Sequence, residues 1–342
     1  MKAVVFRRHG GPDVLEYADM PDPSCGAGQI LVRVKACSIN HLDLWIRQGI
    51  PAYRIQLPHI SGCDVAGVIE RVGVGVTNVK VGDRVVLTPG LCCGTCAWCQ
   101  AGDDNLCASY GIRGAATDGG YAEFTCADAA DALLIPPGLS FEEAAAFPLV
   151  FLTAWHMLVT RAKLRSGDTV LVHAAGSGVG HAAVQIAKQF KATVYATVGS
   201  EDKVSKAKAL GAEQVINYQR ENFEERVKSL TGGRGVDVVF EHIGPQTWES
   251  SLRALAKGGR LVTCGATSGP SVPLDLRYVF SRQLSILGSM MGARAELQTI
   301  AQLISERTLR PIVDTVFPLR DALAAQERML SRDLFGKFVL VP

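Results

Sequence analysis

The sequence lacks the features that direct a chain to a membrane or to nucleic acid. Across its 342 residues, no apolar run approaches the roughly 18 residues that a membrane-spanning helix needs. Neither sign of charge is in excess, because 35 Lys and Arg residues face 33 Asp and Glu residues for a net charge of +2. Internal repeats and low-complexity tracts are also missing. We therefore expect a small-molecule partner, with no nucleic acid and no membrane.

An export signal is also missing, since the chain starts directly with the strand-like run Met1–Phe6. The sequence nevertheless holds ten cysteines. Clustered cysteines without an export signal indicate metal binding in a reducing compartment rather than a disulfide framework. The prediction is a cytoplasmic protein.

Four of the cysteines follow the tight pattern C-x2-C-x2-C-x7-C: Cys93, Cys96, Cys99 and Cys107. Thiolates at this spacing can close on one tetrahedral metal, and four sulfur ligands leave no open position for water or substrate. We therefore predict one structural zinc in a loop over about residues 90–108. An iron–sulfur cluster is also held by four cysteines, and it is the alternative together with plain thiols.

The first third of the chain is rich in short β-type runs separated by turn residues. Examples are Ile30–Ala36, Val65–Val72 and Asp83–Leu87. Close turns between such runs are typical of a compact, partly open β-barrel.

The pattern changes near residue 140, where Ser140 precedes Glu143 in the spacing that starts a helix. Two helices are expected over residues 140–164. Helical patterns then alternate with six short apolar runs: Thr169–Ala174, Ala192–Val198, Gln214–Ile216, Val236–Phe240, Arg260–Cys264 and Leu284–Leu287. This alternation predicts an α/β fold with a doubly wound parallel sheet of six strands. The tail Phe335–Val341 is expected to rejoin the first lobe, which gives a barrel domain of residues 1–150 and 290–342 and a dinucleotide-binding domain of residues 151–289.

The first strand of the predicted sheet runs into a glycine-rich turn, with a helix expected over Ala182–Phe190. Glycines let the backbone approach a pyrophosphate, and a helix N-terminus offers N–H groups to it. The strict G-x-G-x-x-G fingerprint is met only at its last position, Gly180. The expected pyrophosphate contacts are Gly176, Ser177, Gly178, Val179 and Gly180.

The next strand ends at Val198–Ser200 without the acidic residue that takes the ribose 2′-hydroxyl of NAD. Ser200 and Lys203 could instead meet a 2′-phosphate, which favours NADP(H). NAD(H) stays open if Lys203 is only a solvated helix residue. Other predicted cofactor contacts are Thr153, Tyr218, His242, Gly265 and Lys337.

Together these features resemble the medium-chain dehydrogenase/reductase superfamily. The resemblance rests on the following motifs: Gly67–Gly73, Val81–Val85, the four cysteines, Gly119–Glu123 and Ala175–Gly180. The resemblance implies a GroES-like barrel beside a Rossmann sheet. It also implies a homodimer or homotetramer in which the apolar strand Leu284–Ser289 pairs with its twin. The superfamily includes zinc alcohol dehydrogenases, and quinone oxidoreductases that lack the catalytic zinc.

The catalytic zinc positions of the dehydrogenases are altered in this sequence. By the resemblance, Asn40, Cys63 and Leu149 stand where the three ligands are found, and Leu42 and Trp45 stand in the proton relay. A catalytic zinc needs three protein ligands and an open site, so we expect none here. A zinc alcohol dehydrogenase that uses Cys63 and His41 in an altered ligand set remains the alternative.

Without a metal, reduction of a quinone or an enone is easier than oxidation of an alcohol. The developing enolate oxygen then needs only hydrogen-bond donors, and Asn40 can supply one. Asn40 could equally cap the helix that starts near His41. Asp64 is expected to orient substrate or water, and Asp43 either relays a proton or ties down the barrel. A protein that binds NADPH without catalysis is the alternative from another class.

Overall fold

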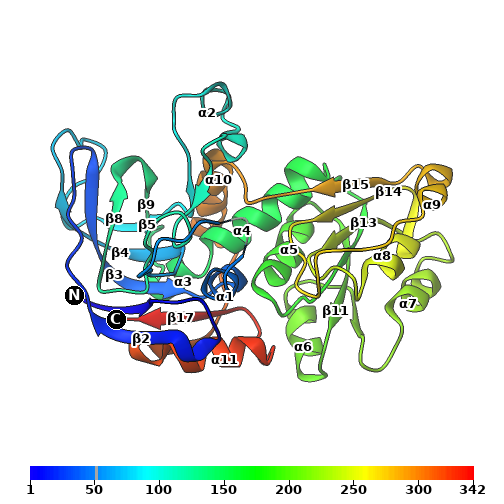
Figure 1. The fold of residues 1–342 in the computed structure, drawn as a ribbon. Coiled ribbons are helices and arrows are strands. Elements are labelled where there is room, and N and C mark those ends of the chain that lie inside the picture. The colour runs from blue at the N-terminus through cyan, green and yellow to red at the C-terminus, as the bar shows by residue number, and fades with distance from the viewer. Residues whose placement is uncertain (51–52) are drawn as a thin grey trace. The chain divides into compact units, whose positions relative to one another are not determined.

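The computed structural model describes residues 1–50 and 53–342, which form two compact units (Figure 1). The first unit is Met1–Leu149 with Ala293–Pro342, and the second is Val150–Gly292. Within the described residues, no helix is both long enough and apolar enough to cross a membrane.

The first unit is built on a seven-stranded sheet in the order β16-β17-β3-β4-β5-β9, with β8 also paired to β3. These strands are β3 (Gln29–Ser38), β4 (Asp64–Val72), β5 (Arg84–Leu87), β8 (Phe124–Asp128), β9 (Ala132–Leu134), β16 (Val313–Pro318) and β17 (Lys337–Val341). Strand β17 pairs with β3, so the prediction that the tail rejoins the first lobe is confirmed.

Smaller strand pairs complete this unit. The pair β1 (Lys2–Phe6) and β2 (Leu15–Asp19) attaches through single bridges to Ala122 and His59. The pair β6 (Gly90–Leu91) and β7 (Gly111–Ile112) flanks the cysteine loop. The β-rich first lobe expected from the sequence is confirmed.

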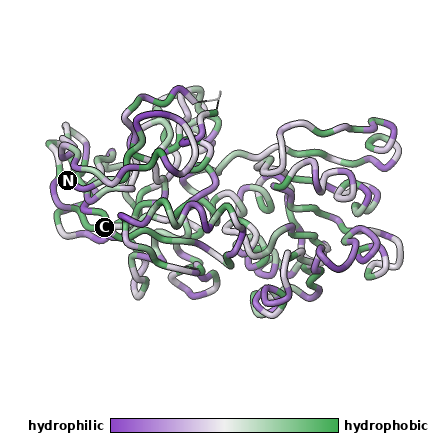
Figure 2. Tube along the Cα trace, turned by 60° about the horizontal axis from the view of Figure 1, so that its bottom comes forward, coloured by the Kyte–Doolittle hydropathy of each residue, from purple (hydrophilic) through white to green (hydrophobic). Residues whose placement is uncertain are grey.

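Strand β3 shows why the sheet forms, since Ile30, Val32 and Val34 alternate along it and are all buried in the hydrophobic core. Figure 2 shows this separation of apolar from polar residues in each unit, with hydrophobic stretches inside and hydrophilic ones largely in the outer loops. The helices of this unit are α1 (His41–Gln48), α2 (Ala97–Ala101), α3 (Phe141–Ala145), α10 (Arg294–Ser305) and α11 (Ala322–Leu330). Four short 3₁₀ turns are η1 (Pro12–Val14), η2 (Asp104–Leu106), η3 (Ala129–Asp131) and η5 (Leu319–Asp321).

The helix-start signal at residue 140 is confirmed. The Ser140 hydroxyl accepts from Glu143 N at 3.1 Å, and the Glu143 carboxylate accepts from Ser140 N at 2.9 Å. These two bonds satisfy backbone groups that a helix N-terminus otherwise leaves free.

The second unit holds a parallel six-stranded sheet in the order β12-β11-β10-β13-β14-β15. The strands are β10 (Thr169–Val172), β11 (Thr193–Val198), β12 (Gln214–Asn217), β13 (Val236–Glu241), β14 (Leu255–Thr263) and β15 (Ser285–Gly288). In sequence order this is 3-2-1-4-5-6, the Rossmann arrangement, which binds ligands where the strand order reverses, beside β10. The predicted doubly wound sheet is confirmed.

The helices of this unit are α4 (Pro148–Trp155), α5 (Gly178–Gln189), α6 (Asp202–Ala209), α7 (Phe223–Leu230), α8 (Trp248–Ala254) and α9 (Leu276–Arg282). The end of α4 widens into a π-helical turn, η4 (His156–Arg161). His156 is buried in that turn, as a packed helix residue would be.

Candidate functional site

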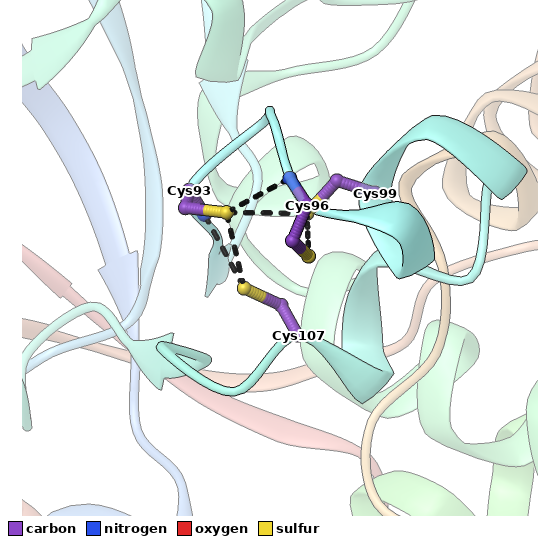
Figure 3. Close-up of side chains that lie close together, drawn as sticks. All are labelled: Cys93, Cys96, Cys99 and Cys107. Atoms are coloured by element: carbon purple, nitrogen blue, oxygen red, sulfur yellow. Dashed lines mark hydrogen bonds between the residues drawn. The ribbon is translucent and has the colours of Figure 1, made fainter.

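The four cysteines of the predicted zinc loop converge (Figure 3). Their Sγ atoms lie within 4.8 Å of one another. Cys96 and Cys99 are 3.5 Å apart, Cys93 and Cys107 are 3.5 Å apart, and Cys93 and Cys99 are 3.9 Å apart. A tetrahedron with Zn–S bonds of about 2.3 Å places sulfurs about 3.8 Å apart. The donor set therefore fits one zinc ion with four protein ligands and no open position.

Local backbone geometry favours a thiolate at Cys93, whereas burial and a hydrogen bond from Cys96 raise the pKa of the Cys99 thiol. Backbone N–H groups of Thr95 and Cys96 lower the pKa of the Cys93 thiol to about 6, with a smaller effect from the Thr95 hydroxyl. A metal-binding cysteine must lose its proton, so these donors assist zinc binding. The loop is also anchored to its own unit, because Asp104 accepts from Arg294 N at 2.9 Å and Arg294 pairs with Asp131.

A second polar cluster lies at the end of β3 and the start of α1 and β4. Its centre is the fully buried Asp64 carboxylate, which accepts from Ser38 Oγ at 2.9 Å and Asn40 Nδ2 at 2.8 Å through Oδ2. Its other oxygen accepts from the backbone N of Leu149 at 2.8 Å. The ammonium of Lys337, on β17, lies 3.4 Å from Asp64 Oδ2 and supplies the buried counter-charge. A buried carboxylate needs such partners to remain ionised.

Both polar atoms of the Asn40 side-chain amide, Oδ1 and Nδ2, form hydrogen bonds. Lys337 donates to Asn40 Oδ1, which fixes the orientation of the amide because an ammonium only donates. Asn40 Nδ2 then donates to Asp64 and, at 3.3 Å, to Cys63 Sγ. A thiol sulfur is a weak acceptor, so the bond to Cys63 is the one that a better acceptor can replace. Asn40 is only 4% exposed.

Asn40 also occupies the N-cap of α1, which begins at His41 as expected. The Asp43 carboxylate, in the first turn, accepts from Asn40 N at 2.7 Å and from Tyr121 OH at 2.9 Å. Burial raises the Asp43 pKa to about 6, although both hydrogen bonds act in the opposite direction. Asp43 therefore ties the start of α1 to the segment before β8 and sets the position of Asn40.

The cluster offers a poor donor set for a second zinc. Burial raises the pKa of the Cys63 thiol well above its ordinary value, which disfavours the thiolate form that zinc binds. The Lys337 ammonium already lies beside the Asp64 carboxylate. Leu42 and Leu149 contribute no side-chain ligand, and a catalytic zinc needs three.

The glycine-rich turn lies in the second unit after β10, between strand and helix as predicted. The helix expected from Ala182 begins four residues earlier, at Gly178, with Ser177 as its N-cap. The Ser177 hydroxyl accepts from Gly180 N at 3.0 Å. Gly180 also passes Ala174 so closely that a Cβ on Gly180 would lie 2.2 Å from the Ala174 carbonyl oxygen. Gly178, Val179 and Gly180 thus form the first helical turn, whose N–H groups can meet a pyrophosphate.

Three of the predicted cofactor contacts, Ser200, Lys203 and Tyr218, lie near the end of β11. Tyr218, which follows β12, stands over Gly199, where a Cβ would lie 2.4 Å from the phenol oxygen. The Ser200 hydroxyl donates to the Asp202 carboxylate and lowers its pKa, and Lys203 lowers it further. A cation and an anion therefore adjoin Ser200.

The β13 end is held by a buried polar network. The Glu241 carboxylate accepts from Ile243 N at 2.5 Å and Gly244 N at 3.1 Å. His242 Nε2 bonds the carbonyl of His173 at 3.1 Å, and burial lowers the His242 pKa. His242 is thus a neutral group that shapes the strand end.

The remaining predicted cofactor contacts have different surroundings. Thr153 is buried in α4 with its hydroxyl 3.9 Å from Met291 Sδ, and Gly265 follows β14 with its carbonyl accepting from Thr263 Oγ1 at 3.2 Å. Lys337, in contrast, is bonded within the first unit to Asn40 and Asp64. The sequence signal for that role is the position of Lys337 at the start of an otherwise apolar strand, where a buried charge needs a partner.

Three comparisons place the chain among known proteins. A family model described as "Alcohol dehydrogenase GroES-like domain" matches residues 26–137, and one described as "Zinc-binding dehydrogenase" matches residues 178–306. The chain is 36% identical to an alcohol dehydrogenase of Geobacillus stearothermophilus, with 99% of each chain covered. It is 34% identical to a quinone oxidoreductase of Pseudomonas aeruginosa, covering 100% of this chain and 99% of that one.

Among solved structures, one titled "Crystal Structure of NAD-dependent alcohol dehydrogenase" is 48% identical, has a TM-score of 0.96 and is matched over 100% of both chains. These likenesses extend over both units and include alcohol dehydrogenases and quinone oxidoreductases. The chain is therefore an oxidoreductase that belongs to the medium-chain dehydrogenase/reductase superfamily.

Proposed function

We propose that this oxidoreductase uses NADP(H) to reduce an activated carbonyl acceptor, a quinone or an α,β-unsaturated carbonyl, without a catalytic zinc. The observation that carries the proposal is the ammonium of Lys337 hydrogen-bonded to Asn40 in the polar cluster. A fixed positive charge there takes over the electrostatic role of a metal, because both stabilise negative charge that develops on a carbonyl oxygen.

In this mechanism the chain binds the acceptor with its carbonyl oxygen at Asn40 Nδ2. That oxygen replaces Cys63 Sγ as hydrogen-bond acceptor, while Asp64 keeps the second Nδ2 hydrogen. Lys337 polarises the amide through Asn40 Oδ1, which strengthens the N–H as a donor. A nicotinamide cofactor, when bound, would supply the hydride. Asn40 and Lys337 then stabilise the developing enolate, and a solvent proton completes the reduction.

Asp43 and Asp64 act as positioning residues in this proposal. Asp64 holds Asn40 and Lys337 together, and Asp43 fixes the first turn of α1 on Tyr121. Positioned groups lower the barrier because they need no rearrangement as charge develops.

Preference for NADP(H) rests on the end of β11. Val198–Ser200 offer no carboxylate for a ribose hydroxyl, and Lys203 can pair with a 2′-phosphate. NAD(H) is the alternative, because Asp202 lies beside Ser200 and the 48% identical structure is that of an NAD-dependent alcohol dehydrogenase.

The experiment is a panel of quinones, enones and primary and secondary alcohols, each assayed with NADPH and NADH, together with zinc analysis. We expect reduction of quinones or enones with NADPH and one zinc per chain. Alcohol oxidation that depends on a second zinc would favour the zinc alcohol dehydrogenase with an altered ligand set. NADPH binding without turnover on any of these compounds would favour the non-catalytic nucleotide-binding protein.

We also propose a homo-oligomer formed through β15. This strand ends the six-stranded sheet, and Leu276 and Phe280 on the neighbouring α9 are 67% and 69% exposed. An uncovered strand edge beside apolar side chains invites pairing with an identical copy. Sedimentation should give a dimer or tetramer, and Ile286→Lys should shift it towards monomer. Particles of only 36.5 kDa at micromolar concentration would contradict this proposal.

A further inference from the structure

Two cysteines outside the zinc cluster lie against each other on the first unit. Cys25 is in the loop before β3 and Cys126 is on β8, 101 residues later in the chain. Their Sγ atoms are 3.3 Å apart, and both residues are partly exposed. A disulfide has an S–S bond of about 2.05 Å, so closing the gap needs a shift of only about 1.2 Å.

A strand pairing and the hydrogen bonds of one side chain keep the two thiols close together. Strand β8 pairs with β3 so that Cys126 lies opposite Leu31. The Gln29 side-chain oxygen accepts from Gly26 N at 3.0 Å and from the Cys126 thiol at 3.4 Å. Gln29 therefore holds the Cys25 loop and Cys126 in one arrangement.

Two other cysteines of the first unit outside the zinc cluster do not share this accessibility. Cys37 and Cys63 are buried in the hydrophobic interior, with exposed fractions of 1% and 0%. Burial raises the pKa of both thiols well above the ordinary value, and a thiol must ionise before it reacts.

We propose that Cys25 and Cys126 form a reversible disulfide, a redox modification site that joins the loop before β3 to β8. The oxidant is a small-molecule disulfide such as oxidised glutathione. Each cycle consumes one oxidised molecule RSSR, forms the protein S–S bond, and releases two thiols RSH that carry the two protein protons.

The two thiols take different parts in this exchange. Burial, aided by the hydrogen bond with Cys25, raises the Cys126 pKa to about 12, so Cys126 stays protonated at neutral pH. Cys25 attacks first and forms a mixed disulfide with loss of one RSH. The mixed disulfide removes the Cys25 thiol that helps to raise the Cys126 pKa, so Cys126 can lose its proton and attack Cys25 Sγ, and the second RSH leaves with that proton.

Closure of this bond constrains a chain segment of 101 residues in the unfolded state. Long closed loops give large stabilisation in the chain-entropy description. The disulfide lies at the start of β3, whereas Asn40 and the pairing with β17 lie at its other end, so we expect the bond to raise the melting temperature of the chain by several degrees and to leave turnover unchanged.

The test uses the full-length, zinc-loaded chain incubated with oxidised glutathione, then alkylated, digested and analysed by mass spectrometry. We expect a peptide cross-linked between Cys25 and Cys126 that disappears when reduced glutathione is added in excess. Cys264→Ser, which removes another partly exposed cysteine, should leave the cross-link intact. Cys126→Ser should lose the cross-link and trap glutathione on Cys25.

Absence of the cross-linked peptide from folded protein, or its formation only after urea unfolding, would overturn the proposal. Glutathione trapped on Cys126 in Cys25→Ser, but not on Cys25 in Cys126→Ser, would overturn the assigned order of attack.

Discussion

Lys337 donates a hydrogen bond to the side-chain oxygen of Asn40, although 297 residues separate them in the sequence. Strand β17 carries Lys337 and pairs with β3, whose end leads into Asn40. The contact therefore depends on the last strand of the chain joining the sheet of the first unit. It places a cation beside the amide that we assign to the acceptor carbonyl.

The first prediction concerns this cation. Lys337→Met should lower kcat on the best quinone or enone by on the order of 10²–10³, the usual cost of removing a group that stabilises a developing oxyanion. NADPH affinity should change little, and Lys337→Arg should recover part of the rate. Since Asp64 loses its counter-charge in Lys337→Met, the melting temperature should also fall.

A different result would support the other role predicted for Lys337, which is contact with the cofactor. If Lys337→Met weakened NADPH binding in proportion to the loss of kcat/KM, Lys337 would be a cofactor contact.

Asn40 gives the second prediction. Asn40→Ala should reduce kcat on an enone or quinone by on the order of 10²–10³ with NADPH affinity nearly constant. The matched control is Ser38→Ala, which removes another hydrogen bond to Asp64 and leaves the Asn40 amide in place. Should Asn40→Ala reduce enones at the normal rate, Asn40 would serve only as the cap of α1.

Much of the architecture could be predicted from the sequence because its signals are local. Six apolar runs with helical spacers, Ser140 with Glu143, and four closely spaced cysteines each act within a few residues. The start of α5 was predicted too late, because glycines normally count against a helix and the capping role of Ser177 depends on three-dimensional geometry.

The polar cluster could be predicted only in part. Asn40 and Asp64 were identified by their place in the family pattern, but their partners come from elsewhere in the chain. Tyr121 reaches Asp43 across 78 residues, and the Leu149 backbone reaches Asp64 across 85. Spacing along a sequence carries no information on such pairings.

The third prediction concerns the cysteine cluster. Purified protein should contain one zinc per chain. Because a closed four-cysteine site is structural, Cys96→Ser should lower the melting temperature more than it changes the turnover of the folded protein. Cys92→Ser, at the neighbouring thiol outside the four-sulfur group, is the control and should retain zinc. Lost turnover at an unchanged melting temperature would refute a structural role.

The fourth prediction tests cofactor choice. The chain should bind NADPH more tightly than NADH, and Lys203→Ala should narrow the difference, since a phosphate contact with an ammonium is charge-assisted. Lys208→Ala, on the exposed side of the same helix α6, should leave the ratio unchanged. Equal affinities for both cofactors in the unaltered chain would contradict the assignment.

The fifth prediction follows from the buried carboxyl of Asp43, whose pKa burial raises from 3.8 to about 6. Between about pH 4 and about pH 6 the folded chain binds more protons at this site than the unfolded chain, so its contribution to the free energy of unfolding falls as pH rises. A shift of about two pKa units corresponds to about 3 kcal/mol. Asp43→Asn lacks this titration and can still accept from Asn40 N and Tyr121 OH.

Denaturant unfolding across this pH range measures the effect. Relative to the unaltered chain, Asp43→Asn should gain about 3 kcal/mol in free energy of unfolding from about pH 4 to about pH 7. Asp13→Asn, at a carboxyl whose side chain is 73% exposed, is the control and should show no comparable gain. A difference between Asp43→Asn and the unaltered chain that stays constant with pH would mean that the Asp43 pKa is the same in the folded and unfolded chains. The hydrogen bonds from Asn40 N and Tyr121 OH would then fully offset the effect of burial on that pKa.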